Sequence, residues 1–308
     1  MSKRLKSDAL LFLTAFIWGS AFVAQKVGAD LGTFTYNGIR TFIGGLVLIP
    51  VIIILDKMSA KKGNVQPQTD EEKAAARKTL IIGGICCGLA LFVASTLQQY
   101  GINFTTAGKA GFITSLYAII VPIMSIFMGK KVRPIVWLCV VVGMFGMYLL
   151  CMKGFSFHMQ VGDLFVLLCA FCFAVHILVI DHFSPLCNGV KMSCIQFLLA
   201  GAIGIVCMFI FEDPKIGVIL TYWAPILYAG VLSCGVAYTL QIVAQKDADP
   251  TEASLILCLE SVFSAITGAI ILGETMSMRG FVGCAMIFTA VVISQLPSKK
   301  DRLQARNN

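Results

Sequence analysis

The chain is dominated by apolar runs long enough to cross a lipid bilayer. At 1.5 Å of rise per residue, a helix of about 20 residues matches the thickness of a bilayer's hydrocarbon core. Ten such runs lie near residues 9–27, 34–55, 79–100, 108–128, 134–152, 162–181, 191–211, 223–244, 253–272 and 280–296. Because hydrocarbon cannot hydrogen-bond to backbone groups, segments of this kind must be helical. The sequence therefore predicts an all-α membrane protein with ten transmembrane helices.

The composition agrees with this class. Of the 308 residues, 58% are hydrophobic and 13% are charged, whereas a soluble domain carries about a quarter charged residues. The net charge is +8, but the basic residues lie mostly in the predicted loops and tails. They indicate membrane orientation and phospholipid contact rather than a nucleic-acid surface. We expect the lipid bilayer as a partner and no nucleic acid.

The cysteines do not predict a metal site. Most of the 12 fall within apolar runs, where cysteine behaves as a small hydrophobic residue. Cys169 and Cys172 have the spacing of a metal or redox pair, but they lie on a predicted helix without a second pair. We predict no cofactor. The N-terminal MSKRLK and the apolar run after it resemble a signal peptide, but the run continues to about Val27 without a small-x-small cleavage site, so we expect a retained first span.

The basic residues also predict the orientation, because cytoplasmic loops carry an excess of lysine and arginine. With the N-terminus inside, the inner side holds Lys3, Arg4, Lys6, Lys57, Lys61, Lys62, Lys73, Arg77, Lys78, Lys130, Lys131, Arg133, Lys191, Lys246, Lys299, Lys300, Arg302 and Arg306. The outer side holds Lys26, Lys109, Lys153, Lys215 and Arg279. We expect a bacterial inner-membrane protein with both termini in the cytoplasm. In the long inner loop, Thr69 to Glu72 has capping-box spacing, which predicts a short surface helix.

The second half of the chain repeats the first. A shift of 155 residues takes Asp8 onto Asp163, a shift of 156 takes Arg40 onto Gln196, and a shift of 143 takes Gln98 onto Gln241 and Tyr117 onto Glu260. Because each half has five predicted spans, an odd number, the halves must face opposite ways. The sequence predicts two inverted five-helix repeats, residues 1–155 and 156–298, followed by a basic cytoplasmic tail, 299–308. Transporters built in this way bind substrate near the bilayer midplane, between the repeats.

Several motifs resemble a known family. They are Ala15-Phe16-Ile17-Trp18-Gly19-Ser20, Arg40 early in the second span, Leu259-Glu260-Ser261-Val262-Phe263, and Leu272-Gly273-Glu274. Over nearly the whole chain the sequence resembles EamA-type members of the drug/metabolite transporter superfamily. It departs from that pattern at Ser261, where the family usually has proline, and at Lys130, where it usually has glutamate. The resemblance implies ten spans in two repeats and secondary transport, often export, of amino acids or other small metabolites.

Two charged residues lie well inside predicted spans, away from the span ends. Counting from Thr251, Glu260 is about 13 Å into the ninth span. A charge at such depth costs several kcal/mol unless it faces protein or water, so Glu260 either pairs with a structural partner or lines a cavity. Arg40 has the same two interpretations: it can hold a substrate carboxylate with two hydrogen bonds, or it can form a structural ion pair or bonds to backbone carbonyls.

Six further polar or aromatic residues are candidates for the same cavity. Each also has a purely structural interpretation as packing, hydrogen bonding between helices or, for the histidine, a bond to one neighbour. Together with Arg40 and Glu260, the candidate substrate-binding residues are Trp18, Gln98, Tyr117, His176, Gln196 and Gln241. Trp18 shares a helix face with Gln25, and a pair of His176 with Glu260 would form a proton relay. Glu252 is expected to extend to the membrane interface.

Together with these residues, the family resemblance implies a secondary active transporter, often an exporter, of small polar metabolites such as amino acids. It would work by alternating access around a central cavity, with protons as a candidate coupling ion through Glu260. An uncoupled facilitator is the main alternative. An intramembrane enzyme would need a nucleophile–base set or a metal motif such as HExxH, which the sequence lacks. A sensor or scaffold would usually carry a soluble domain. The sequence does not define the oligomeric state.

Overall fold

The computed structural model describes residues 3–61, 69–104, 107–151, 161–272 and 277–295. Within these ranges every regular element is a helix and no strand is present, which confirms the predicted all-α class. The helices are α1 (Lys3–Val27), η1 (Gly28–Leu31), α2 (Thr33–Lys61), α3 (Asp70–Ile102), α4 (Ala107–Thr114), α5 (Tyr117–Phe127), α6 (Pro134–Cys151), α7 (Val161–Phe183), α8 (Gly189–Phe211), α9 (Ile216–Thr221), α10 (Trp223–Leu227), η2 (Tyr228–Tyr238), α11 (Thr239–Gln245), α12 (Pro250–Leu257), α13 (Leu259–Leu272) and α14 (Met278–Gln295).

Several helices have the length and composition of membrane spans. In the described ranges seven segments qualify, and they are Arg4–Gln25, Thr33–Ser59, Asp70–Ile102, Val161–Phe183, Gly189–Phe211, Trp223–Gln245 and Pro250–Ile271. Three shorter apolar segments, Gly111–Phe127, Pro134–Leu150 and Met278–Ser294, lie where the fourth, fifth and tenth spans were predicted. Large apolar side chains also face outward, among them Phe209 at 70% and Ile270 at 77% exposure, as a lipid-facing surface requires. The count of ten spans stays a prediction.

The predicted short surface helix at Thr69 is wrong in its length. The capping box does form: the Glu72 amide donates to Thr69 Oγ1 (3.2 Å) and the Thr69 amide donates to Glu72 Oε2 (2.9 Å). The helix that begins there is α3, which continues without interruption for 33 residues. The box therefore starts a membrane-spanning helix, because no helix-breaking residue separates the polar first turns from the apolar part.

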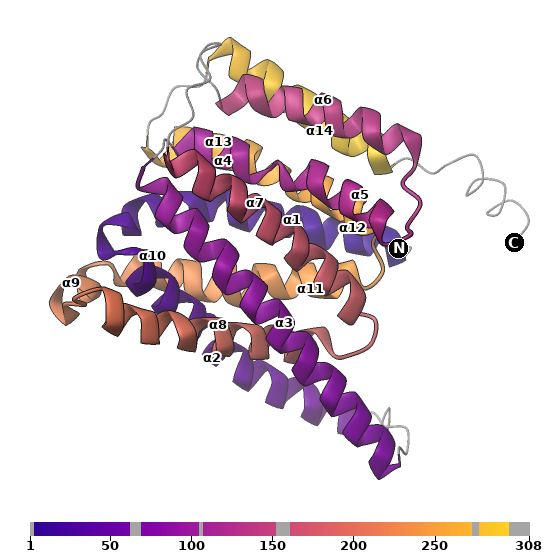
Figure 1. The fold of residues 1–308 in the computed structure, drawn as a ribbon, viewed down its shortest axis with the longest axis vertical. Helices are drawn as coiled ribbons and strands as arrows, with labels where there is room; N and C mark the ends of the chain where they lie inside the picture. The colour runs from indigo at the N-terminus through magenta and orange to yellow at the C-terminus, as the bar shows by residue number, and fades with distance from the viewer. Residues whose placement is uncertain (1–2, 62–68, 105–106, 152–160, 273–276, 296–308) are drawn as a thin grey trace, which may run out of the picture.

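The helices pack in a pattern that two-fold symmetry between the halves would produce (Figure 1). The second helices of the two halves, α2 and α8, pack on each other, and so do the fifth, α6 and α14. Contacts between non-equivalent helices come in matched pairs. The first helix of each half packs on the fourth helix of the other half: α1 packs on α12 and α13, and α7 packs on α4 and α5. The third helix of each half packs on the first helix of the other half: α3 packs on α7, and η2 and α11 pack on α1. Each of these contacts has a counterpart in which the two halves are interchanged.

The first helices of the two halves run in opposite directions. Ion pairs of the segment between α5 and α6 link them: Lys130 pairs with Asp181 near the end of α7, and Arg133 pairs with Glu252 at the start of α12. Glu252 in turn pairs with Arg4 at the start of α1 (2.9 Å). The start of α1 and the end of α7 therefore lie at the same end of the bundle, as an inverted repeat requires.

Glycines allow α2 and α8 to approach closely. A Cβ atom on Gly201 would lie 2.5 Å from the Phe42 nitrogen, and one on Gly204 would lie 2.7 Å from the Gly38 Cα. A Cβ on Gly45 would lie 2.8 Å from Leu198. Small residues at these positions bring the backbones together, and packing then takes the place of the hydrophobic effect, which is absent between helices in lipid.

The fourth helix of each half is interrupted at an equivalent position. The break between α4 and α5 follows Thr114, and the break between α12 and α13 follows Leu257, its counterpart by the shift of 143. Just after each break a side chain bonds to the carbonyl four residues earlier: Ser115 Oγ donates to the Gly111 carbonyl (2.9 Å) and Cys258 Sγ donates to the Ser254 carbonyl (3.3 Å). Such bonds bend helices. Tyr117 and Glu260 follow these breaks.

Candidate functional site

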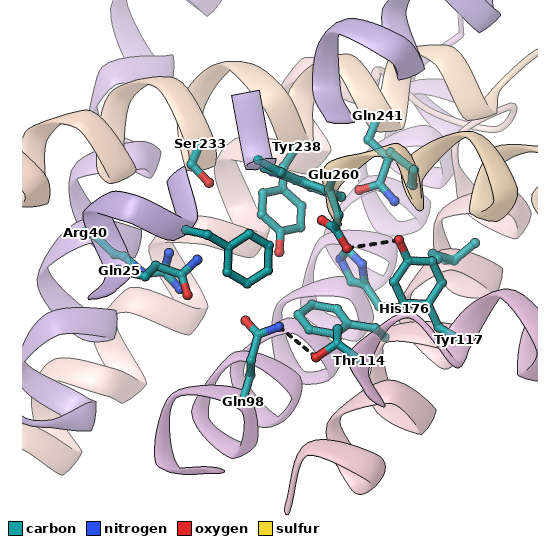
Figure 2. Close-up of a pocket in the computed structure, with 15 residues that line it drawn as sticks. Gln25, Arg40, Gln98, Thr114, Tyr117, His176, Ser233, Tyr238, Gln241 and Glu260 are labelled. Carbon is teal, nitrogen blue, oxygen red and sulfur yellow. Dashed lines mark hydrogen bonds between the residues drawn. The ribbon is translucent and has the colours of Figure 1, made fainter. Parts of the chain in front are cut away.

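A cavity lies between the two halves of the molecule (Figure 2). Helices of both halves contribute to its wall. The lining residues are Trp18, Phe22, Gln25, Arg40, Gln98, Thr114, Tyr117, Phe173, His176, Ile177, Ser233, Tyr238, Gln241, Leu257 and Glu260. The wall combines aromatic rings, amides, one guanidinium and one carboxyl group, which suits a small ligand that is partly apolar and partly charged.

The structure brings seven of the eight candidate residues to this cavity. The exception is Gln196, which lies behind the wall, where its Oε1 is 3.1 Å from His176 Nε2. That bond matches the structural interpretation of Gln196 as a partner for a neighbouring helix. It occupies one of the two ring nitrogens of His176, and among the described residues no hydrogen bond or ion pair joins His176 to Glu260. The binding roles of the other seven remain predictions.

Arg40 is buried, with 6% of its surface exposed, and lines the cavity. Its Nε donates to Asn37 Oδ1 (2.9 Å), and the Asn37 amide donates to the Ser95 carbonyl (2.8 Å). The guanidinium carbon lies 5.2 Å from the centre of the Tyr36 ring. Among the described residues no carboxylate pairs with Arg40. One nitrogen thus orients the side chain, and the rest of the guanidinium is available to a ligand.

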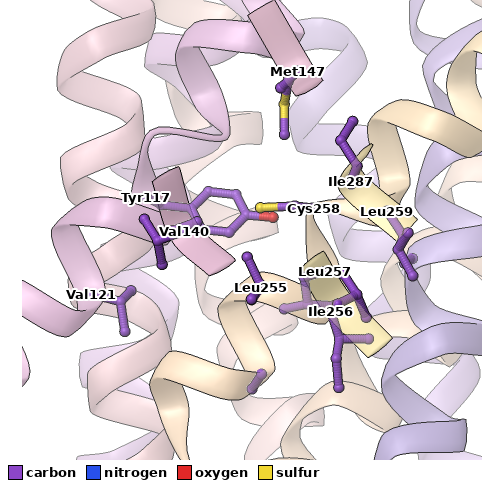
Figure 3. Close-up of a cluster of buried hydrophobic side chains, with 14 of the residues drawn as sticks. Tyr117, Val121, Val140, Met147, Leu255, Ile256, Leu257, Cys258, Leu259 and Ile287 are labelled. Carbon is purple, nitrogen blue, oxygen red and sulfur yellow. The ribbon is translucent and has the colours of Figure 1, made fainter. Parts of the chain in front are cut away.

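Glu260 is also buried, with 7% exposure, and lines the same cavity. Its Oε1 accepts a hydrogen bond from the Tyr117 hydroxyl (3.2 Å) (Figure 2). In the described ranges no lysine or arginine forms an ion pair with it. Tyr117 itself belongs to a buried apolar cluster that includes Val121, Val140 and Leu255 (Figure 3). This cluster holds the tyrosine ring in place while its hydroxyl reaches the carboxyl group.

Aromatic rings surround the polar groups. The Trp18 and Tyr238 ring centres are 4.4 Å apart, and Tyr238 meets His176 edge to face at 5.9 Å. Trp18 therefore combines its two predicted roles, because it packs on a neighbouring ring and also forms part of the cavity wall. Trp18 Nε1 is buried without a hydrogen-bond partner, as is Gln25 Oε1. Unpaired buried polar atoms are rare in native proteins, and here they border a cavity.

Comparison with known proteins gives the family. The model of the EamA-like transporter family matches this chain twice, over residues 5–152 and 160–295. The chain belongs to the EamA-like transporter family. It is therefore a multi-pass membrane transporter, which agrees with the resemblance in its sequence motifs.

Individual relatives agree with this assignment. An uncharacterized transporter of Archaeoglobus fulgidus is 30% identical over 302 residues, which cover 96% of this chain and 87% of the relative. An uncharacterized transporter of Clostridium kluyveri is 21% identical over 309 residues, covering 96% and 94%. A solved crystal structure shares the fold with a TM-score of 0.76 at 18% identity, covering 98% of this chain and 99% of the other.

The candidate residues chosen from the sequence left out eight residues of the cavity wall of this EamA-like transporter, and the repeat could have identified some of them. The shift of 155 takes Trp18 onto Phe173 and Phe22 onto Ile177, and the shift of 143 takes Thr114 onto Leu257. Because the halves are related by symmetry, residues equivalent to a wall residue tend to lie on the wall. Ser233 and Tyr238 carry no such signal. They lie on η2, a π-helical segment within the eighth span, and π-helical turns often occur at functional sites.

The charged groups around Glu252 lie at one end of the bundle. Glu252 accepts hydrogen bonds from Arg4 and from Arg133, and Arg133 also donates to the Ser294 carbonyl (2.6 Å). These contacts connect the starts of α1, α6 and α12 with the end of α14. The Glu252 side chain has 14% exposure and pairs with neighbouring helices at this end of the bundle, and its position at the membrane interface stays a prediction. Glu274 and the Lys109 side chain lie outside the described parts.

Proposed function

We propose that this EamA-family protein is a secondary active transporter that exports small zwitterionic metabolites such as amino acids. One observation carries the proposal: Arg40 and Glu260 are both buried, both line one cavity between the halves, and they form no ion pair with each other. Figure 2 places them apart in that cavity, with aromatic rings between them. A zwitterion offers a carboxylate to the guanidinium and an ammonium to the carboxyl group.

The energetics favour this interpretation over a structural one. A charge buried at membrane depth without a counter-ion is costly, and such residues usually mark a substrate or ion path. If the two charges served only the fold, an ion pair between them would satisfy both. Their separation leaves each with unused hydrogen-bonding capacity, which a ligand of matching polarity can take up. The rings of Trp18 and Tyr238 supply an apolar surface for its side chain.

The mechanism that we propose is alternating access. We take residues 1–155 and 156–298 as the two halves, and the rocking of one against the other would expose the cavity to each side in turn. The interruptions after Thr114 and Leu257 precede the two residues that bond across the cavity, Tyr117 and Glu260. Substrate binding at these residues would therefore act directly on the interrupted helices. We assign the end with Arg4 and Glu252 to the cytoplasm, in a bacterial inner membrane, from the distribution of basic residues.

Binding is tested first on purified protein. The twenty proteinogenic amino acids are added one at a time, and the apparent melting temperature is measured. A ligand of the native state raises that temperature with its concentration. We expect at least one amino acid to do so. If none did, and none were transported by proteoliposomes, the amino-acid assignment would be wrong.

Coupling is tested in proteoliposomes with the amino acid that binds. An imposed proton gradient drives accumulation above the equilibrium level if transport is proton-coupled. The second candidate, an uncoupled facilitator, carries the same substrate only until the two concentrations are equal. The presence of a carboxyl group that can exchange a proton, Glu260, in the cavity wall favours the coupled mechanism. Equal final concentrations with and without the gradient would assign the facilitator.

A further inference from the structure

The two repeats differ in one hydrogen bond beside the cavity. In the first half, Gln98 Nε2 donates to Thr114 Oγ1 (3.3 Å) (Figure 2). The shift of 143 residues takes Gln98 onto Gln241 and Thr114 onto Leu257. All four residues line the cavity, so Gln241 and Leu257 occupy the positions that the symmetry predicts from Gln98 and Thr114. Leucine has no hydroxyl group, and the equivalent bond cannot form.

The Gln241 amide is therefore left without a partner. Its Oε1 is buried without a hydrogen bond, and the residue as a whole has 1% exposure. Among the described residues no side chain or backbone group bonds to this amide. A buried amide that has lost water and gained no partner destabilises the protein. Because the amide borders a cavity, a ligand is the group that would relieve this cost.

We propose that the Gln241 amide binds the primary ammonium group of the substrate, together with Glu260. This inference rests on the proposed transport of amino acids. Figure 2 shows Gln241 and Glu260 on one side of the cavity, with Arg40 and Gln25 on the other. An ammonium has three N–H donors, and the carboxyl group of Glu260 already accepts one hydrogen bond from Tyr117. The carbonyl of the Gln241 amide supplies a further acceptor, since no bond in the protein fixes which way that amide points.

The second half thus has Leu257 where the first half has Thr114, and this difference affects ligand binding. It removes the internal partner that would compete with the ligand for Gln241. The transporter would accordingly prefer a primary amine to its N-methylated forms, because each methyl group removes one N–H donor and adds bulk. A site that hydrogen-bonds a donor rejects analogues that lack it, since its own polar groups are then left unpaired.

The test compares three variants with the wild type: Gln241→Leu, Leu257→Thr and Leu257→Val. Threonine and valine have nearly the same shape, so this pair differs by the hydroxyl that would bond to Gln241. The probes are the amino acid that stabilises the wild type most and its N-methyl and N,N,N-trimethyl derivatives. Affinities come from melting-temperature titrations of purified protein. The unliganded melting temperature and elution profile of each variant show that it folds.

We expect the wild type to bind the primary amine about tenfold or more tightly than the trimethyl form, as one lost hydrogen bond to a charged group implies. Gln241→Leu and Leu257→Thr reduce this ratio to about twofold or less, while Leu257→Val keeps the wild-type ratio whatever its absolute affinity. Unchanged ratios in both Gln241→Leu and Leu257→Thr would overturn the role of Gln241 and leave amino-acid transport intact. A wild type that responds to no amino acid would overturn the proposed function and this inference with it.

Discussion

Tyr117 and Glu260 occupy equivalent positions in the two halves and are bonded to each other, with the Tyr117 hydroxyl donating to Glu260 Oε1 (3.2 Å). Two residues that a two-fold axis interchanges can touch only close to that axis. The bond therefore marks the point where the halves meet at the cavity. One half contributes a phenol there and the other a carboxyl group, so the symmetry of the fold does not extend to its chemistry.

Replacement of Glu260 by glutamine should abolish proton coupling. The amide keeps the size and polarity of the side chain but cannot bind and release a proton. We expect Glu260→Gln to lose proton-driven accumulation and the pH dependence of uptake in proteoliposomes, while exchange of labelled for unlabelled substrate continues at higher substrate concentration, because the amide oxygen still accepts a hydrogen bond from the ammonium but carries no charge. Tyr117→Phe removes the hydrogen bond but keeps the carboxyl group, so it should retain coupling at a reduced rate. Wild-type pH dependence in Glu260→Gln would remove this residue from the coupling step.

Replacement of Arg40 by lysine should weaken the binding of the substrate carboxylate. Lysine keeps the positive charge but cannot form two parallel hydrogen bonds to a carboxylate. We expect Arg40→Lys to bind the amino acid about tenfold more weakly, a loss of about 1.4 kcal/mol. The corresponding amino-acid amide, which has no carboxylate, serves as the control ligand, and its weaker binding should change little. Equal losses for acid and amide, measured by melting-temperature titration, would indicate that Arg40 supports the fold and not the ligand.

Removal of the negative charge of Glu252 should destabilise one end of the bundle. Glu252→Gln leaves Arg4 and Arg133 close together without the carboxylate between them. We expect a melting temperature several degrees below that of the wild type at low salt, with a smaller difference at 1 M salt because salt screens the repulsion.

The matched control for Glu252 is Asp56→Asn. Asp56 pairs with Lys191 (2.8 Å), but its side chain has 54% exposure, and exposed ion pairs contribute little. This variant should melt within about a degree of the wild type. If both substitutions changed the melting temperature equally, the Glu252 contacts would stabilise the protein no more than an exposed ion pair does.

A side chain larger than hydrogen at Gly201 should prevent α2 and α8 from packing. A Cβ there would lie 2.5 Å from a backbone nitrogen of α2, which cannot move without displacing the helix. We expect Gly201→Val to give little monodisperse protein on size-exclusion chromatography. Gly217, in α9, has no neighbouring atom within 4 Å of the position of a Cβ, and Gly217→Ala should elute like the wild type. Normal yield and elution of Gly201→Val would contradict the close approach of these helices.

The helical class could be predicted because its cause is local. Long apolar runs must form helices in lipid whatever surrounds them, and every regular element of the described chain is a helix. The family could be recognised for a related reason: its motifs, such as the one around Glu260, are short runs of neighbouring residues that can be read directly from the sequence. The length of α3 was mispredicted because a capping box fixes where a helix starts and carries no information about where it ends.

The cavity could be predicted in part. Charged and amide side chains within apolar runs stand out, and seven of the eight candidates reached its wall. The aromatic and small residues of the wall do not stand out, because a phenylalanine facing the cavity looks the same in sequence as one facing lipid. Gln196 shows the converse limit: its spacing matched that of Arg40, but its side chain bonds to His176 behind the wall.

The sequence by itself determined that the chain is a helical membrane protein built from two related halves, because hydrophobicity and repetition are properties of order along the chain. Only the tertiary structure decided which polar groups find partners. Arg40 bonds to Asn37, Gln98 bonds to Thr114, and Gln241 bonds to neither protein side chain nor backbone in the described ranges. Hydrogen bonding depends on distances of a few tenths of an ångström between residues far apart in the chain, and those distances exist only once the helices have packed.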